Sequence, residues 1–286
     1  MFPEKLRIPL ADWVNSGIEW LVQNYGDSFE AAANSLLTVL VALEHGLRAI
    51  PWWIVIIVVG LIAIYATRHP WKALGMMAAM FAIGLFGLWD LAMQTLAIML
   101  VSIAICILIG IPIGILMSLS NRLQVLVLPL LDVMQTMPSF VYLIPALMLF
   151  GLGKVPAILA TVIYATPPLI RLTDLGIRLV DKSVVEAAKS FGANRLQLLT
   201  GVQLPLALPN IMQGINQTTM MALAMVVIAS MIGARGLGQE VLLGIQRLDF
   251  GRGAEAGLAI VALAIIFDRI TQAFALPNGK ERRPAG

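Results

Sequence analysis

The chain has 286 residues and a formal net charge of +3, and 59% of its residues are hydrophobic while 12% are charged. One core could not bury that much apolar surface, so a water-soluble globular protein is excluded. We therefore expect an all-α polytopic membrane protein. Cys106 has no cysteine partner, and His45 and His69 are far apart without a third ligand nearby. We expect no disulfide, no metal site and no redox chemistry in this chain.

The first 50 residues do not resemble a cleaved signal peptide, because charged residues stand where an apolar segment would be required. Wound as a helix, this region carries one apolar stripe made of Phe29, Leu36, Leu40, Leu43 and Leu47. Its uncharged part, 31–43, is too short to cross a bilayer. We expect it either to lie on the outer leaflet as an interfacial amphipathic helix or to pack on the bundle of spans.

The remaining apolar stretches predict about seven transmembrane helices, because about 20 apolar residues cross a bilayer. Pro205 and Pro209 are expected to interrupt the sixth stretch, and the last must continue through Asp268 and Arg269. The expected spans are 49–67, 73–89, 91–121, 133–153, 155–172, 210–232 and 256–274.

The distribution of Lys and Arg predicts the orientation of these spans. If the segment 184–205 is cytoplasmic, most of the 19 Lys and Arg residues lie inside, as the positive-inside rule requires. The prediction is an N-terminus outside and a C-terminus inside. The expected organisation is an external or interfacial segment, 1–50, one membrane domain, 51–275, and a short cytoplasmic tail, 276–286.

One segment, VVEAAKSFGANRLQLLTGVQLP, is charged and amphipathic within an otherwise apolar chain. Ser183 and Glu186 have the spacing of a capping box that starts a helix. Gly201 suits the left-handed residue that ends a helix, and Pro205 prevents its continuation. The pattern predicts a single helix over 184–200. Small residues on its surface would let another backbone approach closely: Ala187, Ala188 and Gly192.

The same segment resembles the EAA loop of ABC-importer permeases. The matching residues are Glu186-Ala187-Ala188, then Gly192, then Val202-x-Leu204-Pro205, with valine where the pattern usually has isoleucine. Longer stretches, MQTMPSFVYLIPALMLFGLGKVP, PPLIRLTDLGI and NQTTMMALAMVVIASMIGARGLGQ, are similar to the permease subunit of glycine betaine, proline betaine and choline importers. The likeness covers about 91–275.

The resemblance implies a type I ABC importer in the bacterial cytoplasmic membrane. It would contain two permease copies, two ATP-binding subunits and a separate substrate-binding protein, with no nucleic-acid partner. Its coupling helix, 184–200, would lie in a groove on the ATPase. The coupling residues would be Glu186, Ala187, Ala188, Gly192, Leu204 and Pro205. Glu186 would fix the helix start, pair with a basic group of the ATPase, or both.

The chain contains no G-x-x-x-x-G-K-[ST] sequence. We therefore expect ATP and Mg²⁺ to bind the partner subunit, and we expect this chain to be neither an enzyme nor a cofactor-binding protein.

Uncharged polar and aromatic residues near the fourth and sixth predicted spans mark a candidate path for the solute. In a membrane, such side chains either bond neighbouring helices or face a wet cavity, and both alternatives remain open here. A quaternary ammonium group cannot donate hydrogen bonds, so a neutral lining would let it pass without trapping it. The residues are Gln135, Ser139, Phe140, Tyr142, Gln213, Asn216 and Gln217.

Two other functions compete with this interpretation. The first is an ABC permease for another small solute, such as an amino acid. The second is an ion-coupled secondary transporter, which would require an acid such as Asp132 inside the membrane. Because 133–153 is long enough to span the bilayer by itself, we expect Asp132 at the cytoplasmic mouth. No inverted repeat of broken helices accompanies it, which favours the ABC importer.

Overall fold

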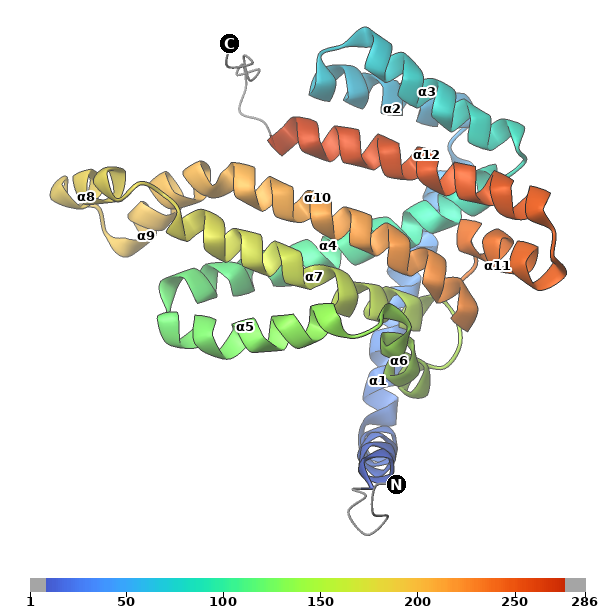
Figure 1. Cartoon of the computed structure of the whole chain (residues 1–286), viewed down its shortest axis with the longest axis horizontal. Helices are drawn as coiled ribbons and strands as arrows, with labels where there is room; N and C mark the ends of the chain where they lie inside the picture. The colour runs from blue at the N-terminus through green and yellow to red at the C-terminus, as the bar shows by residue number, and fades with distance from the viewer. Residues whose placement is uncertain (1–8, 276–286) are drawn as a thin grey trace, which may run out of the picture.

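The computed structural model describes residues 9–275, which form helices and no strands (Figure 1). Four long helices run side by side through the molecule: α4 (Trp89–Leu119), α7 (Lys154–Arg178), α10 (Leu204–Ile228) and α12 (Phe250–Ala275). Two short helices, α8 (Lys182–Ser190) and α9 (Arg195–Leu198), lie at one end of this bundle, and α11 (Leu237–Arg247) lies at the other. The prediction of an all-α fold is confirmed.

Four helical segments are long and apolar enough to cross a membrane, and there are six if each of two bent helix pairs is one span. One bent pair joins α1 (Leu10–Ala49) to α2 (Trp52–Thr67), and the other joins α5 (Asn121–Thr136) to the helical segment Ser139–Phe150. A shorter apolar helix, α3 (Pro70–Leu85), follows α2. The chain is thus a multi-pass membrane protein, while the count of seven and the orientation stay predictions.

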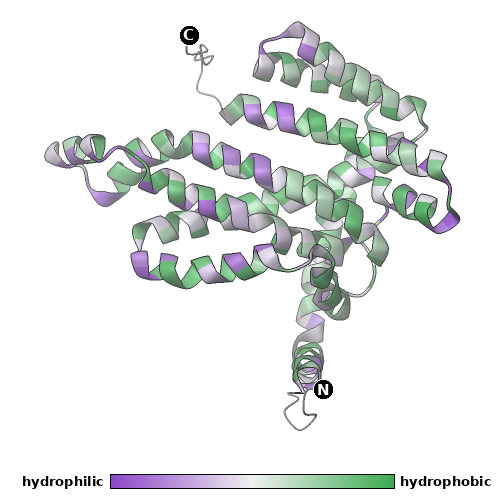
Figure 2. Ribbon diagram, in the orientation of Figure 1, coloured by the Kyte–Doolittle hydropathy of each residue, from purple (hydrophilic) through white to green (hydrophobic). Residues whose placement is uncertain are grey.

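Hydropathy follows this arrangement. Apolar residues cover most of the long helices, and hydrophilic residues gather around α8 and α9 and in the connection between α11 and α12 (Figure 2). The expected tail, 276–286, lies outside the described residues.

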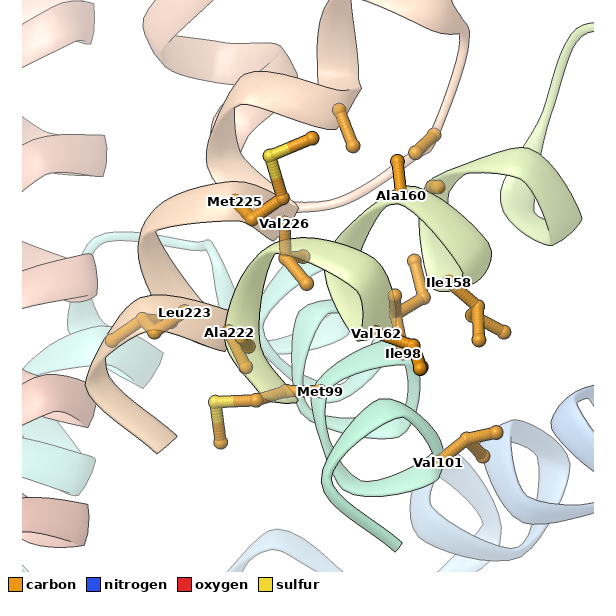
Figure 3. Close-up of a cluster of buried hydrophobic side chains, with 14 of the residues drawn as sticks. Ile98, Met99, Val101, Ile158, Ala160, Val162, Ala222, Leu223, Met225 and Val226 are labelled. Atoms are coloured by element: carbon orange, nitrogen blue, oxygen red, sulfur yellow. The ribbon is translucent and has the colours of Figure 1, made fainter. Parts of the chain in front are cut away.

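Helices α4, α7 and α10 form the core, in which apolar side chains from all three helices meet (Figure 3). Glycines let the backbones approach closely. A Cβ atom added at Gly114 of α4 would lie 2.6 Å from the Cβ of Thr173 and 2.8 Å from the carbonyl oxygen of Ile170, both on α7. One added at Gly176 of α7 would lie 2.7 Å from the Cβ of Asn210 on α10. The three helices therefore hold fixed positions relative to one another.

Helix α1 has 40 residues and extends well beyond the predicted stretch 31–43. Its apolar stripe packs on the bundle: Leu40 is fully buried, and Phe29 meets Phe150 edge to face with ring centroids 5.6 Å apart. Glu44 of α1 pairs with Lys154 at the start of α7. Packing on the bundle is therefore confirmed for this half of α1.

The first half of α1 projects away from the bundle and exposes Trp13 and Trp20 (Figure 1). At its other end the helix stops at Ala49, and Pro51 separates it from α2 with a bend of 100°. The placement of α1 on a leaflet stays a prediction.

The predicted span 133–153 is not one continuous helix, because the chain turns sharply inside it. Helix α5 ends at Thr136, Pro138 follows, and the 3₁₀ turn Ser139–Tyr142 leads into α6 (Leu143–Phe150) at a bend of 107°. Pro138 cannot donate a hydrogen bond, and it holds Met137 in an extended conformation with ψ 138°. Helix α5 begins earlier than predicted and continues through Pro129. Asp132 pairs with Arg171 of α7, so it is not an isolated acid.

The predicted interruption at Pro205 and Pro209 is also wrong. The π-helical turn Leu199–Gln203 connects α9 directly to α10, so the helical segment runs from Arg195 to Ile232. Pro205 stands directly after the π turn at the start of α10, and this wider turn accommodates its ring and its missing N–H.

The predicted continuation of the last span through Asp268 and Arg269 is confirmed. Asp268 accepts hydrogen bonds from Gln272, at 2.6 Å, and from Asn216 of α10, at 3.2 Å. The carboxylate therefore has hydrogen-bond partners on both α12 and α10.

The close contact at Gly114 predicts the cost of adding a side chain there. Gly114→Ala places a methyl group against α7, so the free energy of unfolding should fall by about 1–3 kcal/mol. Tryptophan-detected thermal unfolding of the purified protein measures this loss. The control is Gly75→Ala in α3, where an added Cβ meets nothing within 4 Å. An equal loss in both variants would contradict the packing argument.

Candidate coupling segment and solute path

The segment from α8 to the π turn stands at the end of the bundle with little of its surface covered (Figure 1). None of the side chains of α8 is buried. Apolar side chains are exposed along it: Val184 is 42%, Leu196 68% and Phe191 93% accessible. Together these exposed apolar side chains beside the charged α8 make a candidate surface for another protein. Sequence reasoning missed Phe191, although it directly precedes Gly192.

The start of α8 differs from the predicted capping box of Ser183 and Glu186. Asp181 is the N-cap, and its carboxylate accepts a hydrogen bond of 2.8 Å from the backbone N–H of Ser183. This bond lowers the pKa of the Asp181 carboxyl below its usual 3.8. The cap is therefore complete at neutral pH and is lost as the pH falls through that lowered pKa. The helix begins at Lys182, so Ser183 already lies inside it.

The predicted single helix over 184–200 is two helices joined by a tight turn. Helix α8 ends at Ser190, and Gly192 takes a left-handed conformation with φ +84°. The N–H groups of Gly192 and Ala193 donate to the carbonyls of Lys189 and Ala188 at 2.9 and 3.1 Å. These two bonds form a Schellman motif, in which glycine is the favoured left-handed residue.

A capping box does exist in this segment, but it lies at the start of α9. The side chain of Asn194 accepts from the N–H of Gln197, and the side chain of Gln197 accepts from the N–H of Asn194, both at 2.9 Å. Gly201 lies inside the π turn and ends no helix. The N-x-x-Q spacing that begins two residues after Gly192, at Asn194, was the sequence signal that could have placed the break correctly.

The residues of the EAA pattern have different surroundings in the structure. Glu186 and Ala187 are exposed, and Ala188 is half-buried. The carboxylate of Glu186 has no hydrogen-bond or ion-pair partner among residues 9–275. Leu204, the first residue of α10, instead packs against the core between α7 and α10, and Pro205 follows it in the first turn of that helix. The pattern thus contains an exposed part on α8 and an anchored part on α10.

Two of the candidate path residues form hydrogen bonds with neighbouring helices. Tyr142 is 7% exposed, and its hydroxyl donates a 2.6 Å hydrogen bond to the carbonyl of Met134, which closes the bend after α5. Asn216 is 5% exposed and donates to Asp268 of α12. These contacts are the interhelical bonding that was one of the two alternatives.

The other candidate path residues remain accessible. Gln213 and Gln217 are exposed one turn apart on α10. Gln135 and Phe140 are exposed before and after the bend that follows α5, and Ser139 is half-buried there. Whether these side chains line a path stays a prediction.

These helices form a multi-pass membrane bundle with a charged helix and turn exposed at one end. Residues 107–276 match the family model described as the binding-protein-dependent transport system inner membrane component. The chain belongs to this family, and it is an integral component of the inner membrane. The family description itself names a binding protein as a partner of the transport system.

Relatives of known function are transport permeases, not enzymes. The chain is 47% identical to the glycine betaine/proline betaine transport system permease protein ProW of Escherichia coli K12 over 282 residues, 99% of this chain and 78% of ProW. It is 45% identical to the glycine betaine transport system permease protein OpuAB of Bacillus subtilis 168 over 266 residues, 93% of this chain and 94% of OpuAB.

A solved structure has the same fold. The MetNI methionine ABC transporter, in an inward-facing conformation, contains a chain that matches with a TM-score of 0.57 and 23% identity. The match covers 63% of this chain and 93% of that one.

The cap at Asp181 can be tested in the isolated protein. Asp181→Ala removes the acceptor for the first N–H groups of α8, so amide hydrogen exchange in α8 should become roughly fivefold faster. Exchange in α10 should not change. Ser183→Ala keeps the backbone bond and should alter exchange much less. If Ser183→Ala speeds exchange as much as Asp181→Ala does, the result would support the predicted capping box of Ser183 and Glu186 instead.

Proposed function

We propose that this chain is the membrane-spanning permease subunit of an ATP-driven importer for quaternary ammonium solutes, such as glycine betaine, proline betaine, choline or carnitine. The observation that carries the proposal is the identity of 45–47% to glycine betaine permeases over 93–99% of the chain. A further relative, 45% identical, is the glycine betaine/carnitine transport permease protein GbuB of Listeria monocytogenes. The accessible glutamines of α10 provide the neutral polar surface that such a solute requires.

The segment 181–204 is proposed to couple the permease to a separate ATPase subunit. Phe191 would insert into an apolar groove of the ATPase, because its side chain is 93% exposed in the isolated chain. Glu186 would pair with a basic group of the ATPase, because Asp181 already supplies the cap that Glu186 was expected to support. Gly192 would set the turn that presents Phe191.

The complete importer is proposed to contain two copies of this chain, two ATPase subunits that bind ATP and Mg²⁺, and a separate binding protein. The α8 end of the bundle would face the cytoplasm, and the binding protein would meet the opposite end. Gln135, Ser139, Phe140, Gln213 and Gln217 would line the solute path.

Phe191 provides the test of the coupling segment. Phe191→Glu should leave the protein inserted but weaken binding to the ATPase at least about tenfold, because a charge would replace a buried aromatic contact. Co-purification and titration with the ATPase subunit measure this loss. Phe250→Glu is the matched control, since Phe250 is 89% exposed but is the first residue of α12, at the end of the bundle opposite α8 (Figure 1). Unchanged ATPase binding in Phe191→Glu would refute the assignment.

Uptake into vesicles tests the solute. Vesicles containing the permease, the ATPase and the binding protein should accumulate labelled glycine betaine when ATP is present, and unlabelled choline or carnitine should compete if the site accepts the whole class. Gln213→Ala combined with Gln217→Ala should lower this uptake while ATPase binding is retained. Accumulation of an amino acid instead of betaine would favour the alternative permease. Accumulation that requires a proton gradient and no ATP would favour an ion-coupled carrier.

A further inference from the structure

Helix α8 is joined through the chain to α7 on one side and to α9 and α10 on the other, so a displacement of α8 acts on these helices first. Three residues, 179–181, separate the end of α7 at Arg178 from the start of α8 at Lys182. On its other side, α8 leads through the turn at Gly192 into α9 and α10. Helices α7 and α10 contact each other closely at Gly176 and Gly214. A displacement of α8 therefore moves α7 and α10 together.

Helix α5 is less deeply buried than α7 and α10. Of its 16 residues only Leu131 is buried, and its outer surface exposes Val125, Leu126 and Leu130. Its apolar contacts belong to one small cluster around Leu131, Met117 and Ile170, against which further α5 side chains pack: Leu123, Val127, Leu128 and Met134. Polar bonds to α7 add to this packing.

A network of four hydrogen bonds supplies these contacts at the α8 end of the bundle. Arg178 of α7 donates from Nε to Asp174 at 2.8 Å, from Nη1 to Asn121 at 2.6 Å and from Nη2 to the carbonyl of Met117 at 2.6 Å. Gln124 donates to the other carboxylate oxygen of Asp174 at 2.7 Å. We call Asn121, Gln124, Asp174 and Arg178 the α7 joint.

The α7 joint connects three helices. Met117 lies in the last turn of α4, where its carbonyl also accepts from the N–H of Ser120 at 3.2 Å, and Asn121 and Gln124 lie in the first turn of α5. The side chain of Asp174 is 5% exposed, and a carboxylate so deeply buried requires partners for its charge and its lone pairs. The joint thus holds the connection between α4 and α5 against the end of α7.

A second contact links α5 to α7 on the same side of α7, about two turns away from Arg178 of the joint. Arg171 pairs with Asp132 of α5. Arg171 and Arg178 are seven residues apart, about two helical turns, so both lie on the same side of α7. Beyond Asp132, α5 carries Gln135 and continues through the bend into the segment with Ser139 and Phe140. Movement of α7 that reaches α5 would therefore reposition three of the proposed path residues.

We propose that the α7 joint transmits the displacement of the coupling segment to α5 and the solute path, so that Asn121 and Gln124 are positioning residues for transport. This inference rests on the proposed coupling role of α8. When the ATPase pushes α8, α7 moves with it, and the hydrogen bonds of the joint make α5 follow. Without them, the ATPase would still bind and turn over, but α5 would respond less.

The test uses the assembled importer in vesicles, with glycine betaine as solute. Asn121→Ala combined with Gln124→Ala removes two bonds to α5 and leaves the buried pair of Asp174 and Arg178 intact. ATP hydrolysis should remain stimulated by the loaded binding protein, while the amount of solute taken up per ATP hydrolysed should fall at least about fivefold. Asn121→Asp keeps an acceptor for Arg178 and should retain the wild-type ratio.

The matched control is Arg122→Ala, which changes an exposed residue next to Asn121 that takes no part in the joint. It should not alter uptake per ATP. If the double variant proves too unstable to purify, Gln124→Ala alone makes the same comparison. An unchanged ratio would overturn the proposal, and so would a parallel loss of hydrolysis and uptake, which indicates a purely structural role.

Failure of the proposed function would be recognised separately. Phe191→Glu with normal ATPase binding would refute the coupling segment, and wild-type vesicles that take up no betaine would refute the solute. Neither result depends on the α7 joint.

Discussion

The close approach of α4, α7 and α10 is the constraint on which the other parts of the structure depend. Two apolar helices gain little hydrophobic free energy by meeting in a bilayer, because lipid tails are as apolar as their side chains. The gain comes from close van der Waals contact, and Gly114 and Gly176 allow it by leaving no side chain between the backbones. Helix α8 takes its position from this core, because α7 and α10 hold it at both ends.

Outside the core, carboxylates add polar bonds to the apolar packing of the peripheral helices. Glu44 joins α1 to α7, Asp174 joins α7 to α5, and Asp268 joins α12 to α10. A carboxylate removed from water requires a partner, so each of these groups specifies which helices are neighbours. The side chains of Glu44 and Asp174 are 8% and 5% exposed, so water does not readily replace their bonds.

Properties that depend on local composition were predicted well from the sequence. The hydrophobic content required an all-helical membrane fold, the stripe from Phe29 to Leu47 identified the packed side of α1, and the EAA pattern identified the exposed segment. Prolines and glycines were predicted less well. Pro138 ends helix α5 and marks the bend that follows it, whereas Pro129 and Pro205 lie within continuous helical segments. Gly192 takes the left-handed conformation that had been expected of Gly201.

By itself, then, the sequence determined that the chain is a helical membrane protein with one segment suited to a partner outside the bilayer, because hydrophobic periodicity and charge act over a few residues. Only the tertiary structure decided which proline bends the chain and which polar residues serve as bonds between helices. The effect of a proline depends on whether neighbouring turns can accommodate its ring and its missing N–H. The role of Asn216, Asp174 or Tyr142 depends on which group, distant in sequence, lies within hydrogen-bonding distance.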